Sequence, residues 1–236
     1  MSRSGVSAAT IGILVLTLVS GCALFPAPHP TETPFAVFSG TPSPTRPALA
    51  ALVVTPDSVG DIAIDAPVPA SSRMATFDPA ACVSNDSGVK PGDPDAGAWV
   101  ANYPLDANIR EPFDIIVLPQ TETAKVDMIW VWGSQLQTAA GIHVGSSASS
   151  VAAAYPHPDT VRHGKVSDVD VLNGTVGTLA IEIAHSDAKA KRYWGSQAGT
   201  VLWMSVVAPG VTGPSVNRPV ARTDAVPEPC ITQDDE

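Results

Sequence analysis

The chain has 236 residues, of which 44% are hydrophobic and 15% charged, enough apolar material for one sizeable core or two small ones. Its 23 acidic residues outnumber its 13 basic ones, which gives a formal net charge of −10. Proteins bind phosphate backbones mainly through Lys and Arg, so this balance argues against a nucleic-acid partner.

The N-terminal segment, residues 1–21, has the three parts of a secretory signal. Arg3 supplies the positive start, residues 8–19 form a short apolar run, and small residues precede Cys22. A helix of about twelve residues rises only about 18 Å, whereas the hydrocarbon of a bilayer is roughly 30 Å thick. The segment therefore predicts export, and a transmembrane anchor is the weaker interpretation.

Residues 18–22, Leu-Val-Ser-Gly-Cys, resemble the lipobox of bacterial lipoproteins. The resemblance implies that signal peptidase II cleaves before Cys22 and that this cysteine becomes the acylated first residue of the mature protein. It also implies a lipid-anchored protein on the extracytoplasmic face of the cell membrane, with the membrane as one of its partners.

Residues 22–50 are rich in proline, threonine and serine and are predicted to be a disordered tether. Proline lacks an amide donor, and the few apolar residues here cannot form a core. Such a spacer spans about 30 Å as a coil and up to about 90 Å when fully extended. A domain held in this way can search the membrane surface or reach into the cell wall.

Cys82 and Cys230 are the two cysteines that remain if Cys22 carries lipid. An even number of cysteines in an extracytoplasmic compartment predicts a disulfide, with two buried free thiols as the alternative. Their spacing matches no metal-binding pattern and the chain has no Cys-x-x-Cys, so no metal site and no cofactor are expected.

A two-fold internal repeat, offset by roughly 80 residues, dominates the rest of the sequence. Residues 59–64 and 140–145 share a pattern of glycine and alternating apolar residues, and each is followed by a stretch of small residues. Two predicted strands come after each, at 113–118 and 126–132 in the first copy and at 178–184 and 201–207 in the second. The prediction is an α+β fold of two tandem copies of short helix plus antiparallel sheet, at 51–133 and 134–213, with a C-terminal tail at 214–236.

The helix of the second copy has clear signals. Ser147 is a predicted N-cap, Val151 and Tyr155 fall on one apolar face, and Pro156 stops the run. In the first copy, Pro69 suits a first helical turn, although the apolar face there is poorer.

Residues 141–155, Gly-Ile-His-Val-Gly-Ser-Ser-Ala-Ser-Ser-Val-Ala-Ala-Ala-Tyr, resemble the repeat of the beta-lactamase-inhibitor-protein-like and outer-membrane-assembly-lipoprotein-like group. The match covers mainly 138–207 and, more weakly, 54–132, where Asp65 stands in place of Gly145. The resemblance implies a short helical segment packed on an antiparallel sheet in each repeat. It also implies a non-catalytic binding module located in the envelope.

Motifs for nucleophilic, phosphate-binding or zinc-protease chemistry are missing from the sequence, so no catalytic residue is predicted. Four histidines lie near aspartates in the second copy: His143, His157, His163 and His185, with Asp159, Asp168, Asp170 and Asp187. Their spacing is not that of a preorganised metal site, which favours scattered surface histidines. Asp168 and Asp170 alternate on one predicted strand face, where a solvated surface is expected rather than an acid–base pair. An envelope hydrolase or metal-dependent enzyme using this copy is the alternative function.

Residues 189–194, Lys-Ala-Lys-Arg-Tyr-Trp, combine basic and aromatic groups between two predicted strands. Such a loop can contact anionic lipid head groups or teichoic-type polymers. The plainer interpretation is a solvated hairpin loop anchored by Trp194.

Trp130 and Trp132 alternate along one predicted strand, so both rings project from the same face, and Trp203 lies in the corresponding strand of the other copy. These rings form either a core between the copies or an exposed aromatic platform for a partner. The predicted function is a binding or scaffolding module for an envelope protein, with Trp130, Trp132 and Trp203 as the partner-binding residues.

Overall fold

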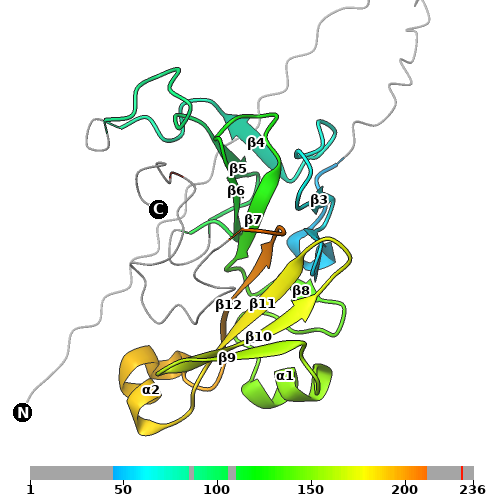
Figure 1. The fold of residues 1–236 in the computed structure, drawn as a ribbon, viewed down its shortest axis with the longest axis vertical. Coiled ribbons are helices and arrows are strands. Elements are labelled where there is room, and N and C mark those ends of the chain that lie inside the picture. The colour runs from blue at the N-terminus through cyan, green and yellow to red at the C-terminus, as the bar shows by residue number, and fades with distance from the viewer. Residues whose placement is uncertain (1–44, 85–87, 106–109, 212–229, 231–236) are drawn as a thin grey trace, which may run out of the picture. The chain divides into compact units, whose positions relative to one another are not determined.

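The computed structural model describes residues 45–84, 88–105, 110–211 and Cys230. The predicted export signal, the lipid-bearing Cys22 and most of the predicted tether lie outside the described residues, as does the predicted tail apart from Cys230. The regular secondary structure of the described residues is mostly β-strand, with two short α-helices, which agrees with an α+β fold (Figure 1). No α-helix in these ranges is long and apolar enough to span a bilayer.

An eight-stranded antiparallel sheet is the main structure, with the order β4-β5-β6-β7-β12-β11-β10-β9. Its strands are β4 Ala75–Asp78, β5 Ala98–Ala101, β6 Phe113–Val117, β7 Val126–Val131, β9 Thr160–His163, β10 Ser167–Asn173, β11 Thr178–Ala184 and β12 Val201–Val207. Each half of the chain contributes a four-stranded meander, and the last strands of the two meanders pair at the centre, with Met204 opposite Val131. The strands predicted at 113–118, 126–132, 178–184 and 201–207 are confirmed within a residue at their ends.

A second, four-stranded sheet has the order β3-β2-β1-β8 and covers part of one face of the large sheet (Figure 1). Its strands are β1 Val53–Thr55, β2 Ser58–Val59, β3 Ile62–Ala63 and β8 Gln137–Thr138, and a 3-10 turn, η1 Leu49–Ala51, precedes them. Val59 and Ile62 of this sheet share one core cluster with Ile129, Ile181 and Met204 of the large sheet. The core therefore joins residues from both halves of the chain.

The predicted helix of the second half is confirmed as α1, Ala148–Ala154. The Ser147 side chain accepts a hydrogen bond from the N–H of Ser150, Val151 is fully buried, and Tyr155 is the C-cap. This N-cap satisfies an amide that the helix itself leaves without a partner.

The helix expected after Pro69 in the first half is absent: residues 66–74 form turns and an isolated bridge. Pro67 and Pro69 both lack an amide donor, and the N–H of Ser72 bonds to the carbonyl of Pro69 in a single turn. Val68 and Met74 are buried, so this segment supplies core side chains without a helical face.

The loop expected at 189–194 is instead a helix, α2 Ala188–Trp194, followed by a 3-10 turn, η2 Gly195–Gln197. The Asp187 carboxylate caps it by accepting hydrogen bonds from the N–H groups of Lys189 and Ala190. Ala, Lys and Arg favour helices and the side chain of Ala190 is fully buried, so capping and packing together select a helix over an open loop.

The structure pairs Cys82 with Cys230, and their Cα atoms are 5.2 Å apart, within the range that a disulfide bridges. Cys82 lies between β4 and β5, where its N–H donates to the carbonyl of Ala96 at 3.0 Å. The pairing joins positions 148 residues apart in the sequence. Whether the bond forms in the purified protein remains a prediction for chemical analysis.

Candidate functional site

Trp130 of β7, Trp132 directly after β7 and Trp203 of the neighbouring strand β12 come together on one face of the large sheet. The ring centroids of Trp130 and Trp132 are 5.2 Å apart and stacked. The Trp203 ring lies 6.0 Å from Trp130 and 5.8 Å from Trp132. The three predicted partner-binding residues therefore form one cluster.

A fourth ring, Trp194 from α2, completes what we call the aromatic cluster: Trp130, Trp132, Trp194 and Trp203. Trp194 meets Trp203 edge to face at 5.8 Å, and its indole N–H donates to the carbonyl of Val166 at 3.2 Å. The strand pattern of the sequence does not place Trp194 in this group. Ala190 and Trp194, four residues apart on a helix, are the signal that identifies it, because such residues share one helical face.

The centre of the aromatic cluster is buried, whereas its edge is open. Trp130 is 0% exposed and Trp203 is 5% exposed, while Trp132 and Trp194 are half-buried. Among the described residues, the indole N–H groups of Trp130 and Trp203 have no hydrogen-bond acceptor. The central rings are thus packed as a core, and Trp132 and Trp194 are the members that solvent can reach.

The open edge carries polar groups of both signs around Trp132. The Arg110 guanidinium lies 4.1 Å from the centroid of the Trp132 ring, and the indole N–H donates to the carboxylate of Asp114. Arg110 is exposed. Half-exposed aromatic rings beside arginine are typical of the residues that dominate protein–protein binding energy.

A second polar group forms where β9, β10 and the end of β11 meet. Oδ1 of Asp168 lies 3.0 Å from His185 Nε2 and 3.2 Å from His163 Nδ1. It also accepts a hydrogen bond from the N–H of Gly164 at 3.2 Å. Asp168 and His163 are opposite each other in the β9–β10 pairing. Two of the four histidines of this half therefore share one carboxylate oxygen. By contrast, His143 Nδ1 contacts the carbonyl of its own neighbour, Val144, at 2.9 Å.

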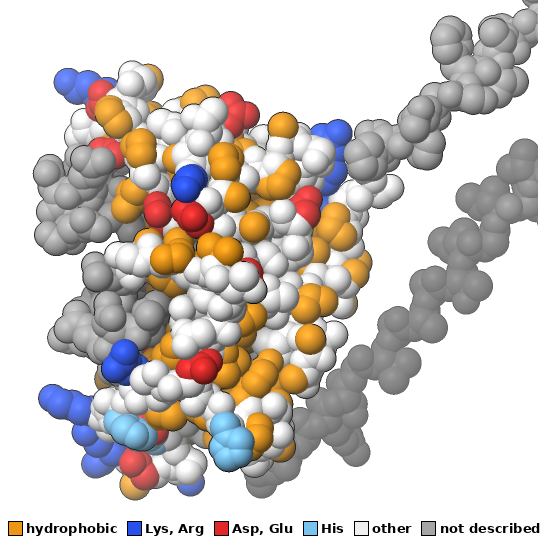
Figure 2. Space-filling model, turned by 45° about the vertical axis from the view of Figure 1, so that its right-hand side comes forward, with side chains coloured by type: hydrophobic (Ala, Val, Ile, Leu, Met, Phe, Trp, Pro, Cys, Tyr) orange, Lys and Arg blue, Asp and Glu red, His pale blue; other side chains and the backbone are white. Residues whose placement is uncertain are grey.

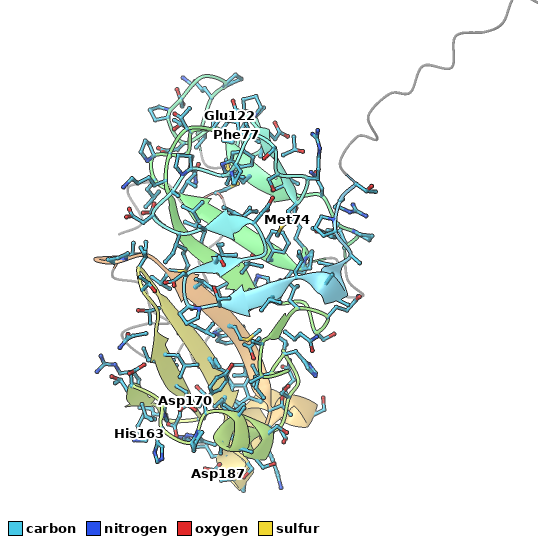
Figure 3. All side chains as sticks on the ribbon, turned by 90° about the vertical axis from the view of Figure 1, so that its right-hand side faces the viewer. Met74, Phe77, Glu122, His163, Asp170 and Asp187 are labelled. Atoms are coloured by element: carbon cyan, nitrogen blue, oxygen red, sulfur yellow. A yellow bond between two sulfur atoms is a disulfide. The ribbon has the colours of Figure 1, made fainter. Side chains whose placement is uncertain are left out.

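Asp168 and Asp170, which share a face of β10 as predicted, have pKa values moved in opposite directions. Burial raises the pKa of Asp168, but the hydrogen bonds from His185, Gly164 and His163 outweigh burial and leave the pKa lowered. Burial raises the pKa of Asp170, and the charge of Asp168 raises it further. Both side chains are partly buried rather than fully solvated. Figure 3 shows His163, Asp170 and Asp187 at one end of the molecule.

Metal-binding geometry is not found at this group: in the described part of the chain, no three or more His, Cys, Asp or Glu side chains are arranged to hold an ion.

An open hollow of about 410 Å³ lies elsewhere, lined by residues that include Arg46, Leu49 and Tyr103. There the Arg46 guanidinium lies 4.6 Å from the Tyr103 ring centroid, and the Tyr103 hydroxyl donates to the carbonyl of Pro47 at 3.0 Å. Residues 46 and 47, part of the predicted tether, are therefore fixed against the folded domain.

No protein-family model matches the chain, and no curated protein or solved structure matches it either. The likeness of residues 138–207 to the beta-lactamase-inhibitor-protein-like repeat therefore remains a resemblance of sequence pattern.

Proposed function

We propose that the protein is a lipid-anchored, extracytoplasmic and non-catalytic binding module that docks an envelope protein at the open edge of the aromatic cluster. One observation carries the proposal: the four tryptophans of the aromatic cluster converge on one face of the large sheet, and only Trp130 and Trp203 among them are buried. Trp132 and Trp194 form the accessible part.

The buried rings beneath this edge would make it rigid. Trp130 stacks under Trp132, and Trp203 contacts both Trp132 and Trp194, so the two half-exposed rings are held in place before a partner arrives. A preordered ring loses little conformational entropy on binding. With Arg110 beside Trp132, the edge combines arginine and tryptophan side chains, which are enriched among the residues that dominate protein–protein binding energy.

Anchoring through Cys22 is the second part of the proposal. Between Cys22 and the first described residues the chain is rich in proline and threonine, and a flexible segment of this length spans about 25–30 Å. The domain would thus work close to the membrane that holds its lipid. This range is enough to meet partners in the same leaflet or in the adjoining wall.

We also propose that the two halves descend from one duplicated unit. The two four-stranded meanders support this, since each ends in a strand at the centre of the large sheet. Backbone conformation supports it as well: Gly60 and Gly141 have φ values of 57° and 78°, and Asp65 and Gly145 have φ values of 55° and 92°. Gly60 and Gly141 occupy corresponding places in the sequence repeat, and Asp65 lies one position from the residue that corresponds to Gly145. A positive φ is uncommon for a non-glycine residue such as Asp65.

The alternative function, an envelope hydrolase, is favoured by the opposite pKa shifts of Asp168 and Asp170, because acid–base pairs depend on such separation. His185 would orient Asp168 through their contact at 3.0 Å. A hydrolytic activity of the purified protein that is lost in His185→Ala, with the fold intact, would support the enzyme over the binding module.

Site-specific photo-crosslinking tests the binding proposal. A photoreactive phenylalanine analogue replaces Trp132, and a control analogue replaces Val161, which is 38% exposed on the edge strand β9. In native envelopes we expect a discrete adduct with one protein from position 132 and none from position 161. The same partner should also lose affinity for Trp132→Ala. Identical adducts from both positions, or no adduct from position 132, would contradict the proposal.

A further inference from the structure

A second surface, at the end of the molecule that holds α2, concentrates positive charge in an otherwise acidic protein. We call it the basic end. It consists of the exposed side chains of Arg162, Lys165, Lys189, Lys191 and Arg192. Figure 2 shows Lys and Arg side chains together with histidines gathered at this end. Five of the 13 basic residues of the chain thus lie in two short segments.

Hydrogen bonds and packing hold these two segments side by side. The carbonyl of Val166 accepts the N–H of His185 at 2.9 Å and the indole N–H of Trp194 at 3.2 Å. Val166, at the end of the turn between β9 and β10, is therefore bonded both to the segment that precedes α2 and to the last residue of α2. Since the fully buried Ala190 sets which side of α2 faces inward, Lys189, Lys191 and Arg192 are directed to solvent.

The cations of the basic end outnumber the acids around them. Residues 162–168 and 185–194 contain five Lys or Arg and two carboxylates, Asp168 and Asp187, a net charge of +3 (5 − 2) before histidines are counted. Asp168 is bonded to His163 and His185, and Asp187 caps α2. In the adjoining strands, Asp170 is half-buried and Glu182 is buried.

None of the five cations forms an ion pair within the described part of the chain. There, the charged pairs closer than 4.0 Å are Lys125 with Asp65 and the two histidines with Asp168. Tyr193, which is 50% exposed, stands among the cations and packs edge to face on Trp194 at 4.7 Å. An amphipathic ring among cations is the side-chain combination found where proteins meet the lipid–water interface.

We infer that the basic end docks onto an anionic phospholipid surface, with the cations at the head groups and the Tyr193 ring at the level of the interface. Charge complementarity favours this occupant, since a basic surface gains attraction for each Lys or Arg near anionic lipid. The exposed tyrosine favours a membrane over a soluble polyanion, because only the membrane offers an apolar layer to its ring. This docking surface is separate from the open edge at Trp132 and would orient the domain on the membrane.

Vesicle co-sedimentation tests the inference on the mature chain from residue 22 carrying Cys22→Ser, so that no lipid anchor contributes. We expect binding to vesicles that contain phosphatidylglycerol and none to phosphatidylcholine vesicles. High salt should release the protein, because the Debye length falls to about 3 Å at 1 M. The triple variant Lys189→Gln, Lys191→Gln, Arg192→Gln should bind roughly a hundredfold more weakly, at about fivefold for each charge removed.

The matched control removes three exposed cations elsewhere: Arg73→Gln, Lys90→Gln and Lys125→Gln, with the same change in net charge. It should retain vesicle binding within a few-fold, and thermal unfolding should show both variants folded. Equal loss in the two variants, or no binding of the parent to anionic vesicles, would overturn the inference. Binding to a soluble teichoic-type polymer but not to vesicles would overturn it in favour of that polymer. Crosslinking from position 132 is measured separately, so its failure would affect only the partner-binding proposal.

Discussion

The carboxylate of Asp57 accepts a hydrogen bond from the backbone N–H of Gly177 at 2.8 Å, across 120 residues of sequence. The same carboxylate accepts the N–H groups of Val176 at 2.9 Å and Thr175 at 3.0 Å. Asp57 lies in the turn between β1 and β2, and its three donors lie in the turn between β10 and β11. One side chain therefore fastens the small sheet to the far half of the large sheet.

Replacing Asp57 by Ala should lower the free energy of unfolding by about 1–2 kcal/mol, a range discounted for the partial exposure of the carboxylate. Three backbone donors would then lose a charged acceptor. Urea unfolding of the two proteins measures the difference. Asp93→Ala is the control: among the described residues the Asp93 carboxylate accepts only the local N–H of Lys90, so its loss should change stability little.

The effect of Asp57 should also depend on pH. The bond from Gly177, followed by that from Val176, lowers the pKa of Asp57 below its model-compound value of 3.8. A lowered pKa in the folded state means that the contribution is complete above about pH 4 and is lost as the pH falls through the folded pKa. The stability difference between the parent and Asp57→Ala should therefore shrink at the acid end, and a difference that grows there would contradict this assignment.

Trp130→Ala and Trp132→Ala should differ in their effect on stability. Trp130 is 0% exposed, and its removal leaves a large cavity, so we expect a loss of about 3–5 kcal/mol in the free energy of unfolding. Trp132 is half-buried, and its loss, with its contacts to Arg110 and Asp114, should cost about 1–2 kcal/mol. Chemical unfolding compares them, and a Trp130→Ala protein of parental stability would show that this ring is not part of the core.

The local features of the fold were predictable, because each depends on residues close together in the chain. The alternation of apolar residues in 178–184 predicts β11, the apolar run at 201–207 predicts β12, and Ser147 with Pro156 marks the ends of α1. The repeat suggested a first helix after Pro69, but a pattern of small residues cannot outweigh two prolines that lack amide donors. The 189–194 segment looked like a hairpin loop because it joins two strands, although Asp187 is a good N-cap.

The long-range features were not predictable from one sequence. The Asp57 contact joins turns that are separated by more than a hundred residues, and no local pattern marks a carboxylate for that role. The sequence placed four histidines near aspartates, but only the register of β9 and β10 selects His163 and Asp168, and only the end of β11 brings in His185. The sequence predicts Trp130 and Trp132 on one strand and Trp203 on another, whereas Trp132 directly follows β7 and Trp194 comes from α2.

The disulfide between Cys82 and Cys230 should be present in freshly purified mature protein. Mass spectrometry of an unreduced tryptic digest should find the two cysteine peptides linked. In the loop-closure model a bond across 148 residues stabilises the fold by up to about 5 kcal/mol, so reduction should lower the midpoint of urea unfolding. The double variant Cys82→Ser, Cys230→Ser controls for other effects of the reductant. Labelling of both thiols in unreduced native protein would show that the bond is absent.

Membrane fractionation of the parent protein and Cys22→Ser tests most directly the claim that this is a lipid-anchored module of the envelope. Two acyl chains hold a protein firmly, at about 0.8 kcal/mol for each buried methylene, and Cys22 is the residue that would carry them. After a high-salt wash, which also removes electrostatic docking by the basic end, the parent should remain with the membranes and carry acyl chains at Cys22 by mass spectrometry. Cys22→Ser should be uncleaved or released as soluble protein. A processed Cys22→Ser protein that stays with washed membranes, or a parent without acyl chains, would contradict the account.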